Sequence, residues 1–262
     1  MVRRLLLAFA VLAAVAASAS PSDAVIACTT GTPAVLNVTT NAATYAFASF
    51  TPAVSSTLVV IAQIRTTVST GAMVNTSGTA LTWTKKISGT FNSGADTTYI
   101  FWANTPASTG ASVYTIDVTG DNGAGIQAAL FTCTGSDIVT GDPLKQADVA
   151  SGASTNPVTD ALTALGTNNG YVASWMGGLS SCPVSTPPSS GGGWTEANDG
   201  CFTSPTSNGS AAYRSTGETG TTITFTAANS TWGLGFAEIY VSGAGPGGWG
   251  GLLDSKRNRL IQ

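Results

Sequence analysis

Along most of this chain apolar and polar residues alternate, and Gly, Asn or Asp residues break the pattern about every ten residues. A period of two is typical of a strand with one buried face, whereas a helix needs a period of about 3.6. No stretch after the N-terminal segment keeps a helical stripe for more than about two turns. The clearest predicted strands are residues 57–65, 81–87, 97–103, 112–119, 126–134, 170–175, 221–226 and 232–242.

Two of these strands predict different surroundings. In residues 112–119, apolar Tyr, Ile and Val alternate with Thr and Asp, which indicates one buried and one exposed face. Residues 58–64 are apolar on both faces except at Gln63, so we expect a central strand that is covered on both sides. Many short strands of this kind favour an all-β fold. We expect a single two-sheet antiparallel β-sandwich, jelly-roll-like, with about ten or more strands rather than the seven of an immunoglobulin domain.

The N-terminus has the layout of a secretory signal peptide at residues 1–19. A basic start with two arginines precedes the apolar residues 5–17, and residues 17–19 offer an A-x-A cleavage site. The alternative is a membrane anchor, but the apolar run of 13 residues is shorter than the about 20 that a spanning helix needs. We therefore expect export to an extracellular, periplasmic or surface location, with no integral membrane segment after signal cleavage.

No change of composition divides residues 20–242, which we expect to form one β-sandwich domain. Residues 243–251 are a Gly-rich linker, and residues 252–262 form a short basic C-terminal tail. This tail is either a frayed terminus or a docking peptide for an acidic surface. The second alternative includes a homo-oligomer held together through the tail.

Charged residues make up only 9% of the chain, well below the about 25% of an average domain. Thr and Ser keep the polar positions hydrated without charge, and β-branched Thr suits a pleated surface. Between residues 24 and 243 there are five basic and eleven acidic residues. Nucleic acids and anionic membranes both require a basic surface. The composition therefore favours a glycan or protein partner and no nucleic acid.

The four cysteines are an even set, as expected of a disulfide-bonded protein in an oxidising compartment. Cys182 and Cys201 flank a Pro- and Gly-rich loop that a disulfide would close, and that pairing leaves Cys28 to join Cys133. The other two pairings stay open. One alternative is a zinc site, for which no C-x2-C spacing exists. Another is lipidation of Cys28, which ends a lipobox-like segment.

The chain contains no histidine, which excludes Ser-His-Asp and Cys-His catalysis and every metal site that needs imidazole. Disulfide-bonded cysteines would leave no thiol nucleophile. What remains is carboxylate chemistry, which glycoside hydrolases perform with two acids. The sequence therefore favours a non-catalytic protein without cofactor or metal. Asp117, Asp121 and Asn122 surround a Gly turn, but their spacing matches no calcium loop, so we expect only a turn there.

The last predicted strand carries one candidate ligand-binding face. Trp232, Glu238 and Tyr240 lie on the same face of this strand, together with two further apolar residues. If that face is exposed, sugar rings could stack on it beside a carboxylate acceptor. If it belongs to the core, as large aromatic residues favour, Glu238 is a buried charge that needs Arg65 or Arg214 as a partner.

The second candidate is the Pro- and Gly-rich loop between the last two cysteines. Trp194, Glu196, Asn198 and Asp199 place an aromatic ring and several hydrogen-bonding groups on that loop. Trp194 is either a ligand contact or a residue that pins the loop to the body of the domain. Glu218 lies in a Gly/Thr turn, where we expect it to be solvated.

The chain contains, in order, the segments LVVIAQIR, LTWTKK, YIFWANTPASTGASVYTIDVTG, GGGWTEA and GFAEIYVSG. In this layout, which covers most of residues 58–243, it resembles uncharacterised exported or phage-associated bacterial β-sandwich proteins. The resemblance implies a sandwich fold and an extracellular or particle-surface role, and it transfers no functional residue.

These observations leave three functions in different classes. The first is an exported, non-catalytic surface-acting module that binds a glycan or a protein, as in adhesion. The second is a structural component of a cell-surface layer, filament or virus particle. The third is a carbohydrate-active enzyme that uses Glu196 or Glu238 with an aspartate as paired carboxylates.

Overall fold

The computed structural model describes the chain from residue 26 to residue 240, with several gaps. The described residues are 26–66, 70–119, 124–136, 138, 141–153, 156–159, 162–178, 188, 193–203, 206–227 and 231–240. The predicted signal peptide 1–19, linker 243–251 and tail 252–262 therefore lie outside the described residues. So do Cys182, Asp121 and Asn122.

The described residues form thirteen strands, all of them paired antiparallel, and contain no helix. An all-β sandwich with more than ten strands is thus confirmed, whereas the jelly-roll form stays a prediction. The strands are β1 (Ala27–Val38), β2 (Thr44–Ala46), β3 (Ser56–Ile64), β4 (Ala72–Ser77), β5 (Thr84–Phe91), β6 (Asp96–Asn104), β7 (Val113–Asp117), β8 (Ile126–Thr134), β9 (Leu144–Ala153), β10 (Gly170–Gly178), β11 (Thr195–Thr203), β12 (Thr206–Arg214) and β13 (Thr231–Ile239).

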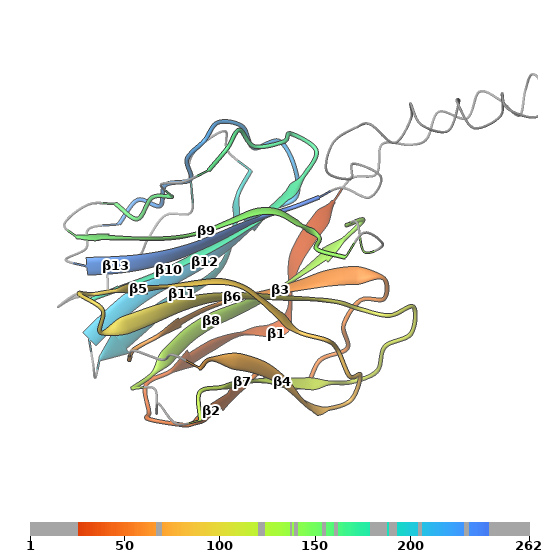
Figure 1. Cartoon of the computed structure of the whole chain (residues 1–262), viewed down its shortest axis with the longest axis horizontal. Coiled ribbons are helices and arrows are strands. Elements are labelled where there is room, and N and C mark those ends of the chain that lie inside the picture. Colours follow the sequence, from red (N-terminus) through yellow and green to blue (C-terminus); the bar gives the residue numbers. More distant parts are fainter. Residues whose placement is uncertain are drawn as a thin grey trace, which may run out of the picture.

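The strands form three stacked sheets (Figure 1). The middle sheet has the order β1-β8-β3-β6-β5, and the outer sheet has the order β11-β12-β10-β13-β9. The small sheet, β2-β7-β4, covers the face of the middle sheet that points away from the outer sheet. The sequence predicted the two-sheet sandwich but not this third layer.

Strand β3 is buried along its whole length because both of its faces are covered. Leu58 and Val60 pack toward the small sheet, whereas Val59 and Ile61 pack toward the outer sheet. The predicted central strand with two covered faces is therefore confirmed. Its one polar residue, Gln63, satisfies both ends of its amide on β10: Nε2 donates to the Ser174 carbonyl oxygen (2.8 Å), and Oε1 accepts from Ser174 Oγ (3.0 Å).

The outer sheet also has two apolar faces, and its second face is covered by non-strand segments, residues 156–166 and 220–227, as far as they are described. Ile223 and Phe225 from these segments pack on Tyr171 and Trp175 of β10. The prediction of a strand at residues 221–226 is wrong, since this segment makes only isolated bridges. Its apolar residues alternate as they do in a strand, but here they pack the segment against the face of the outer sheet.

A disulfide joins Cys28 of β1 to Cys133 of β8, whose Cα atoms lie directly opposite each other at 4.1 Å. This confirms the predicted pair, and a sulfur in a disulfide cannot carry the lipid that the lipobox-like segment suggested. Cys201 is also disulfide-bonded. Its predicted partner, Cys182, is not among the described residues. Across the described ranges, we find no helix with the length and apolar character to cross a bilayer.

Removing the Cys28–Cys133 disulfide should destabilise the fold, because the link spans 105 residues of chain. For a closed loop of that size we expect a loss of about 3–5 kcal/mol in the free energy of unfolding. Urea denaturation of a Cys28→Ala/Cys133→Ala double variant measures it. The control is Thr29→Ser/Thr132→Ser, the neighbouring cross-strand pair. A loss below about 1 kcal/mol would contradict a stabilising role for this link.

Candidate functional site

Glu238 is a structural residue of the core. Its side chain is 0% exposed, and its carboxylate accepts hydrogen bonds from Lys145 Nζ (3.2 Å), the Gly166 backbone nitrogen (2.7 Å) and Asn169 Nδ2 (2.7 Å). The prediction of Arg65 or Arg214 as its partner is wrong. Lys145 is the cation instead, because the neighbouring strand β9 brings its side chain over the same face.

The face of β13 that carries Glu238 belongs to the core and is no surface for sugar stacking. Trp232 is 3% exposed, and Phe236 beside it is fully buried. Both pack under the segments that cover the outer sheet. Tyr240, just after the strand, is half-buried, and its backbone nitrogen donates to the Pro143 carbonyl oxygen (2.9 Å). Trp232 and Glu238 therefore belong to the core, which is the second of the two alternatives that the sequence left open.

Trp194 and Glu218 hold in place a second part of the segments that cover the outer sheet. Glu218 is 1% exposed, so the expectation of a solvated glutamate is wrong. Its Oε2 accepts from Trp194 Nε1 (2.6 Å) and from Arg214 Nη1 (3.1 Å), and these donors replace the water that burial removes. Trp194 also contacts the ring of Tyr171, with centroids 6.4 Å apart. Its indole N–H therefore has a structural partner.

The residues after Trp194 form β11, an edge strand of the outer sheet, rather than a free loop. A β-bulge interrupts its pairing with β12 between Glu196 and Asn198. Because of this bulge, Glu196 and Asp199 lie on the outward face, whereas Asn198 lies on the inward face and bonds Asn37 of β1 (3.2 Å). The four predicted site residues thus divide between two faces of the sheet.

Glu196 and Asp199 are hydrogen-bonded to each other, and this contact changes the protonation of Glu196. Partial burial of its carboxyl group, followed by the hydrogen bond to Asp199 and the charge of Asp199, raises the pKa of Glu196 to about 7. Near neutral pH Glu196 therefore carries a proton in a large share of the molecules. The pair of Glu196 and Asp199 lies on an exposed edge strand and lines neither of the two pockets described next.

A pocket that the sequence did not predict opens beside Trp102, near the end of β6, and has a volume of about 390 Å³. None of its lining side chains is ionisable. The half-buried indole of Trp102 is its large aromatic group, and Trp102 Nε1 has no hydrogen-bond partner in the described part of the chain. The lining residues are Ala80, Leu81, Thr82, Thr84, Trp102, Asn104, Thr105, Pro106 and Gly141.

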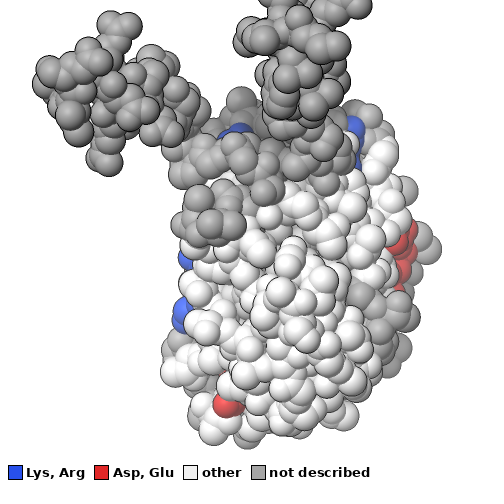
Figure 2. Space-filling model, turned by 90° about the vertical axis from the view of Figure 1, so that its right-hand side faces the viewer, with Lys and Arg blue, Asp and Glu red and all other residues white. Residues whose placement is uncertain are grey.

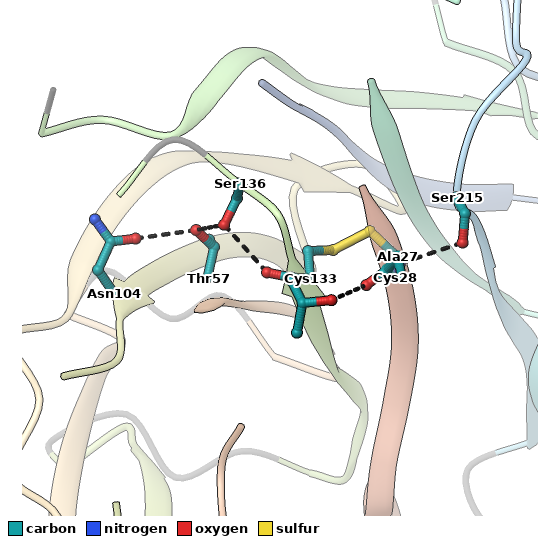
Figure 3. Close-up of a disulfide and its surroundings, with 8 residues drawn as sticks. Ala27, Cys28, Thr57, Asn104, Cys133, Ser136 and Ser215 are labelled. Carbon is teal, nitrogen blue, oxygen red and sulfur yellow. Dashed lines mark hydrogen bonds between the residues drawn. A yellow bond between two sulfur atoms is a disulfide. The ribbon is translucent and has the colours of Figure 1, made fainter. Parts of the chain in front are cut away.

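One wall of this pocket is fixed by a row of hydrogen-bonding groups that leads to the disulfide (Figure 3). Asn104 Oδ1 accepts from Thr57 Oγ1 (3.0 Å), whose oxygen lies 2.8 Å from Ser136 Oγ. Ser136 Oγ in turn donates to the backbone carbonyl oxygen of Cys133 (3.1 Å). Asn104 is therefore held in place, which reduces the entropy that a ligand must remove when it binds there.

A second pocket, of about 340 Å³, lies at the opposite end of β5. It is lined by the turn between β5 and β6, by the end of β9 and by Thr231, again without an ionisable side chain. Three consecutive residues of that turn, Asn92, Ser93 and Gly94, have positive φ angles (51°, 56° and 84°), so the turn is tightly constrained.

Every basic side chain in the described part of the chain is already engaged. Four are in ion pairs with carboxylates, and the fifth, Lys85, lies over the ring of Tyr99, 5.5 Å from its centroid. The ion pairs are Arg65–Asp96, Lys86–Asp142, Lys145–Glu238 and Arg214–Glu218. Figure 2 shows the result on one side of the molecule, a broad surface with few charges.

Comparison with family models, curated proteins and solved structures finds no match for this chain. Among the residues that the structure describes, no three His, Cys, Asp or Glu side chains converge to hold a metal ion. The functional argument therefore rests on the pockets and polar side chains themselves.

The raised pKa of Glu196 predicts a pH-dependent stability. Between its ordinary pKa of 4.5 and the folded-state value of about 7, the folded protein holds a proton that the unfolded chain releases. The stabilisation is therefore complete below about pH 4.5 and is lost as the pH rises through about 7. Urea denaturation across this range, in EDTA, should show that Glu196→Gln removes this decline. Asp117→Asn is the control, and parallel curves for Glu196→Gln and wild type would refute the assignment.

Proposed function

We propose that this chain is an exported, non-catalytic binding module whose ligand is a neutral glycan held in the Trp102 pocket. The pocket carries the proposal because it combines an indole ring, threonine hydroxyls and an amide without any charge. Sugar rings have apolar C–H faces that stack on indoles and hydroxyls that bond to side chains of this kind. A charged or phosphorylated ligand would find no counter-charge in the pocket lining.

The unpartnered indole N–H adds a second argument for a polar ligand. A buried donor without an acceptor carries an unfavourable desolvation free energy of about 1–3 kcal/mol. A sugar hydroxyl oxygen is an acceptor that Trp102 Nε1 lacks among the described residues, and because this nitrogen is buried, the ring must turn before the two atoms can meet. The amide of Asn104 lies on the same pocket wall, where its Nδ2 is 3.4 Å from the carbonyl oxygens of Ile138 and Gly141. These contacts are long, so Nδ2 can donate to a ligand while Oδ1 stays bonded to Thr57.

Export is the second part of the proposal. The basic, apolar and small-residue order of residues 1–19 supports it, because that order is typical of secretory signal peptides. The Cys28–Cys133 disulfide supports it independently, since such bonds persist in oxidising compartments.

The arrangement of carboxylates supports binding over glycoside hydrolysis. Hydrolases place two carboxyl groups about 5–10 Å apart on opposite sides of the scissile bond. Glu238 is buried and paired with Lys145, whereas Glu196 and Asp199 are adjacent on one strand and line neither of the two pockets. A role in particle or surface-layer assembly remains the alternative. It is favoured by the exposed edge strand β4, which carries the exposed Val74.

Blocking the pocket should abolish glycan binding without unfolding the protein. Thr84 is exposed at the pocket rim, so the side chain of a Thr84→Arg variant would occupy the space over Trp102. Affinity electrophoresis through gels with dextran, mannan, laminarin, xylan or galactomannan should retard the wild type. Affinity should fall at least about tenfold in Thr84→Arg.

Ser88→Arg is the matched control, because Ser88 is exposed on the same strand but lines neither pocket. Equal retardation of both variants would refute the Trp102 site. Wild-type protein that binds no glycan but associates with rising concentration would favour the assembly alternative instead.

A further inference from the structure

The outward face of β11 and β12 gathers oxygen-bearing side chains from two adjacent strands. Asp199 of β11 is paired directly with Ser210 of β12, and side chains of paired residues lie on the same face of a sheet. Glu196 joins them because the bulge after it returns its side chain to that face.

One member of this group is buried without a hydrogen-bond partner among the described residues. Ser210 is 0% exposed, and its Oγ lacks a partner. Buried polar groups are nearly always satisfied, so an unsatisfied one requires an explanation. Here the atom is a neutral oxygen ligand directly opposite Asp199.

We propose that Glu196, Asp199 and Ser210 form a calcium site on the outward face of β11 and β12. The group offers oxygen atoms only, which hard cations prefer. Two carboxylates match the charge of a divalent ion. Ser210 supplies a neutral oxygen, and water completes the six to eight ligands that Ca²⁺ takes at about 2.3–2.6 Å.

Calcium fits this group better than magnesium does. Mg²⁺ demands a near-octahedral shell at about 2.0–2.1 Å, whereas Ca²⁺ accepts irregular sets of ligands such as those two strands and a bulge provide. With two carboxylates rather than three or more, we expect a dissociation constant of about 10⁻⁴–10⁻³ M, the range of extracellular calcium modules. An exported protein meets Ca²⁺ in that range.

The calcium site and the glycan pocket lie at opposite edges of the sandwich. β11 and β9 are the two edges of the outer sheet, and β5, which lines the pocket, packs beside β9. The site therefore does not rest on the proposed glycan binding, and the two can fail separately.

Terbium luminescence tests the site on the mature protein, because Tb³⁺ replaces Ca²⁺ and is excited by a nearby indole. Trp175 of β10 is paired with Ser210, close enough to serve as the donor. Excitation of tryptophan should produce Tb³⁺ emission that millimolar Ca²⁺ displaces and equal Mg²⁺ does not. Asp199→Asn and Glu196→Gln should each lower the Tb³⁺ affinity at least about tenfold. Ser210→Ala should lower it by a smaller factor.

Asp117→Asn is the matched control, because Asp117 is an exposed carboxylate of the small sheet whose Oδ1 is bonded to Thr119. It should leave the Tb³⁺ affinity unchanged. Emission that Ca²⁺ fails to displace, or equal affinity in Asp199→Asn, Glu196→Gln and Asp117→Asn, would overturn the calcium site. Both carboxylate variants lie on an exposed edge strand, so their melting in EDTA checks that the fold is intact.

Discussion

Strand β3 has apolar side chains on both faces, and each face needs a covering layer before those side chains leave water. The small sheet covers one face and the outer sheet covers the other. The outer sheet has the same requirement for a covering layer on each face, because β10 is buried on both faces as well. The described residues of segments 156–166 and 220–227 meet it by lying across the remaining apolar surface. The order of layers thus follows from the burial of two central strands.

The covering segments are not sheet strands, so their backbone groups need other partners. Two buried glutamates supply part of that need. Glu238 accepts from the backbone of Gly166, and Glu218 accepts from the backbone of Thr219 as well as from Arg214 and Trp194. These two charges therefore act inside the protein, where they hold the covering segments in place. A neutral pocket on a neutral surface is consistent with a ligand recognised by stacking and hydrogen bonds.

The sequence predicted the structure best where the pattern of apolar and polar residues follows directly from burial. The run 58–64, apolar on both faces, correctly predicted a strand covered twice. Assigning Cys182 and Cys201 to close their loop left Cys28 to pair with Cys133, which is correct. β12 was missed because it packs with small residues: a Cβ on Gly209 would lie 2.3 Å from Gln127 Oε1 and from the Trp175 carbonyl oxygen. Glu218 and the Trp102 pocket depend on contacts between residues far apart in the chain, which no local pattern records. Trp102 itself had no sequence signal that distinguished it from a core tryptophan.

The central functional claim is that the Trp102 pocket holds a sugar, and the indole N–H of Trp102 reports on it directly. The six tryptophans each give one indole signal in a ¹⁵N-labelled sample. Titration with an oligosaccharide cut from a polysaccharide that the protein retains should shift the Trp102 Nε1–H signal. The signals of Trp194 and Trp232 should stay in place, since both rings serve the fold. A fixed Trp102 signal, with shifts at another indole, would contradict the account.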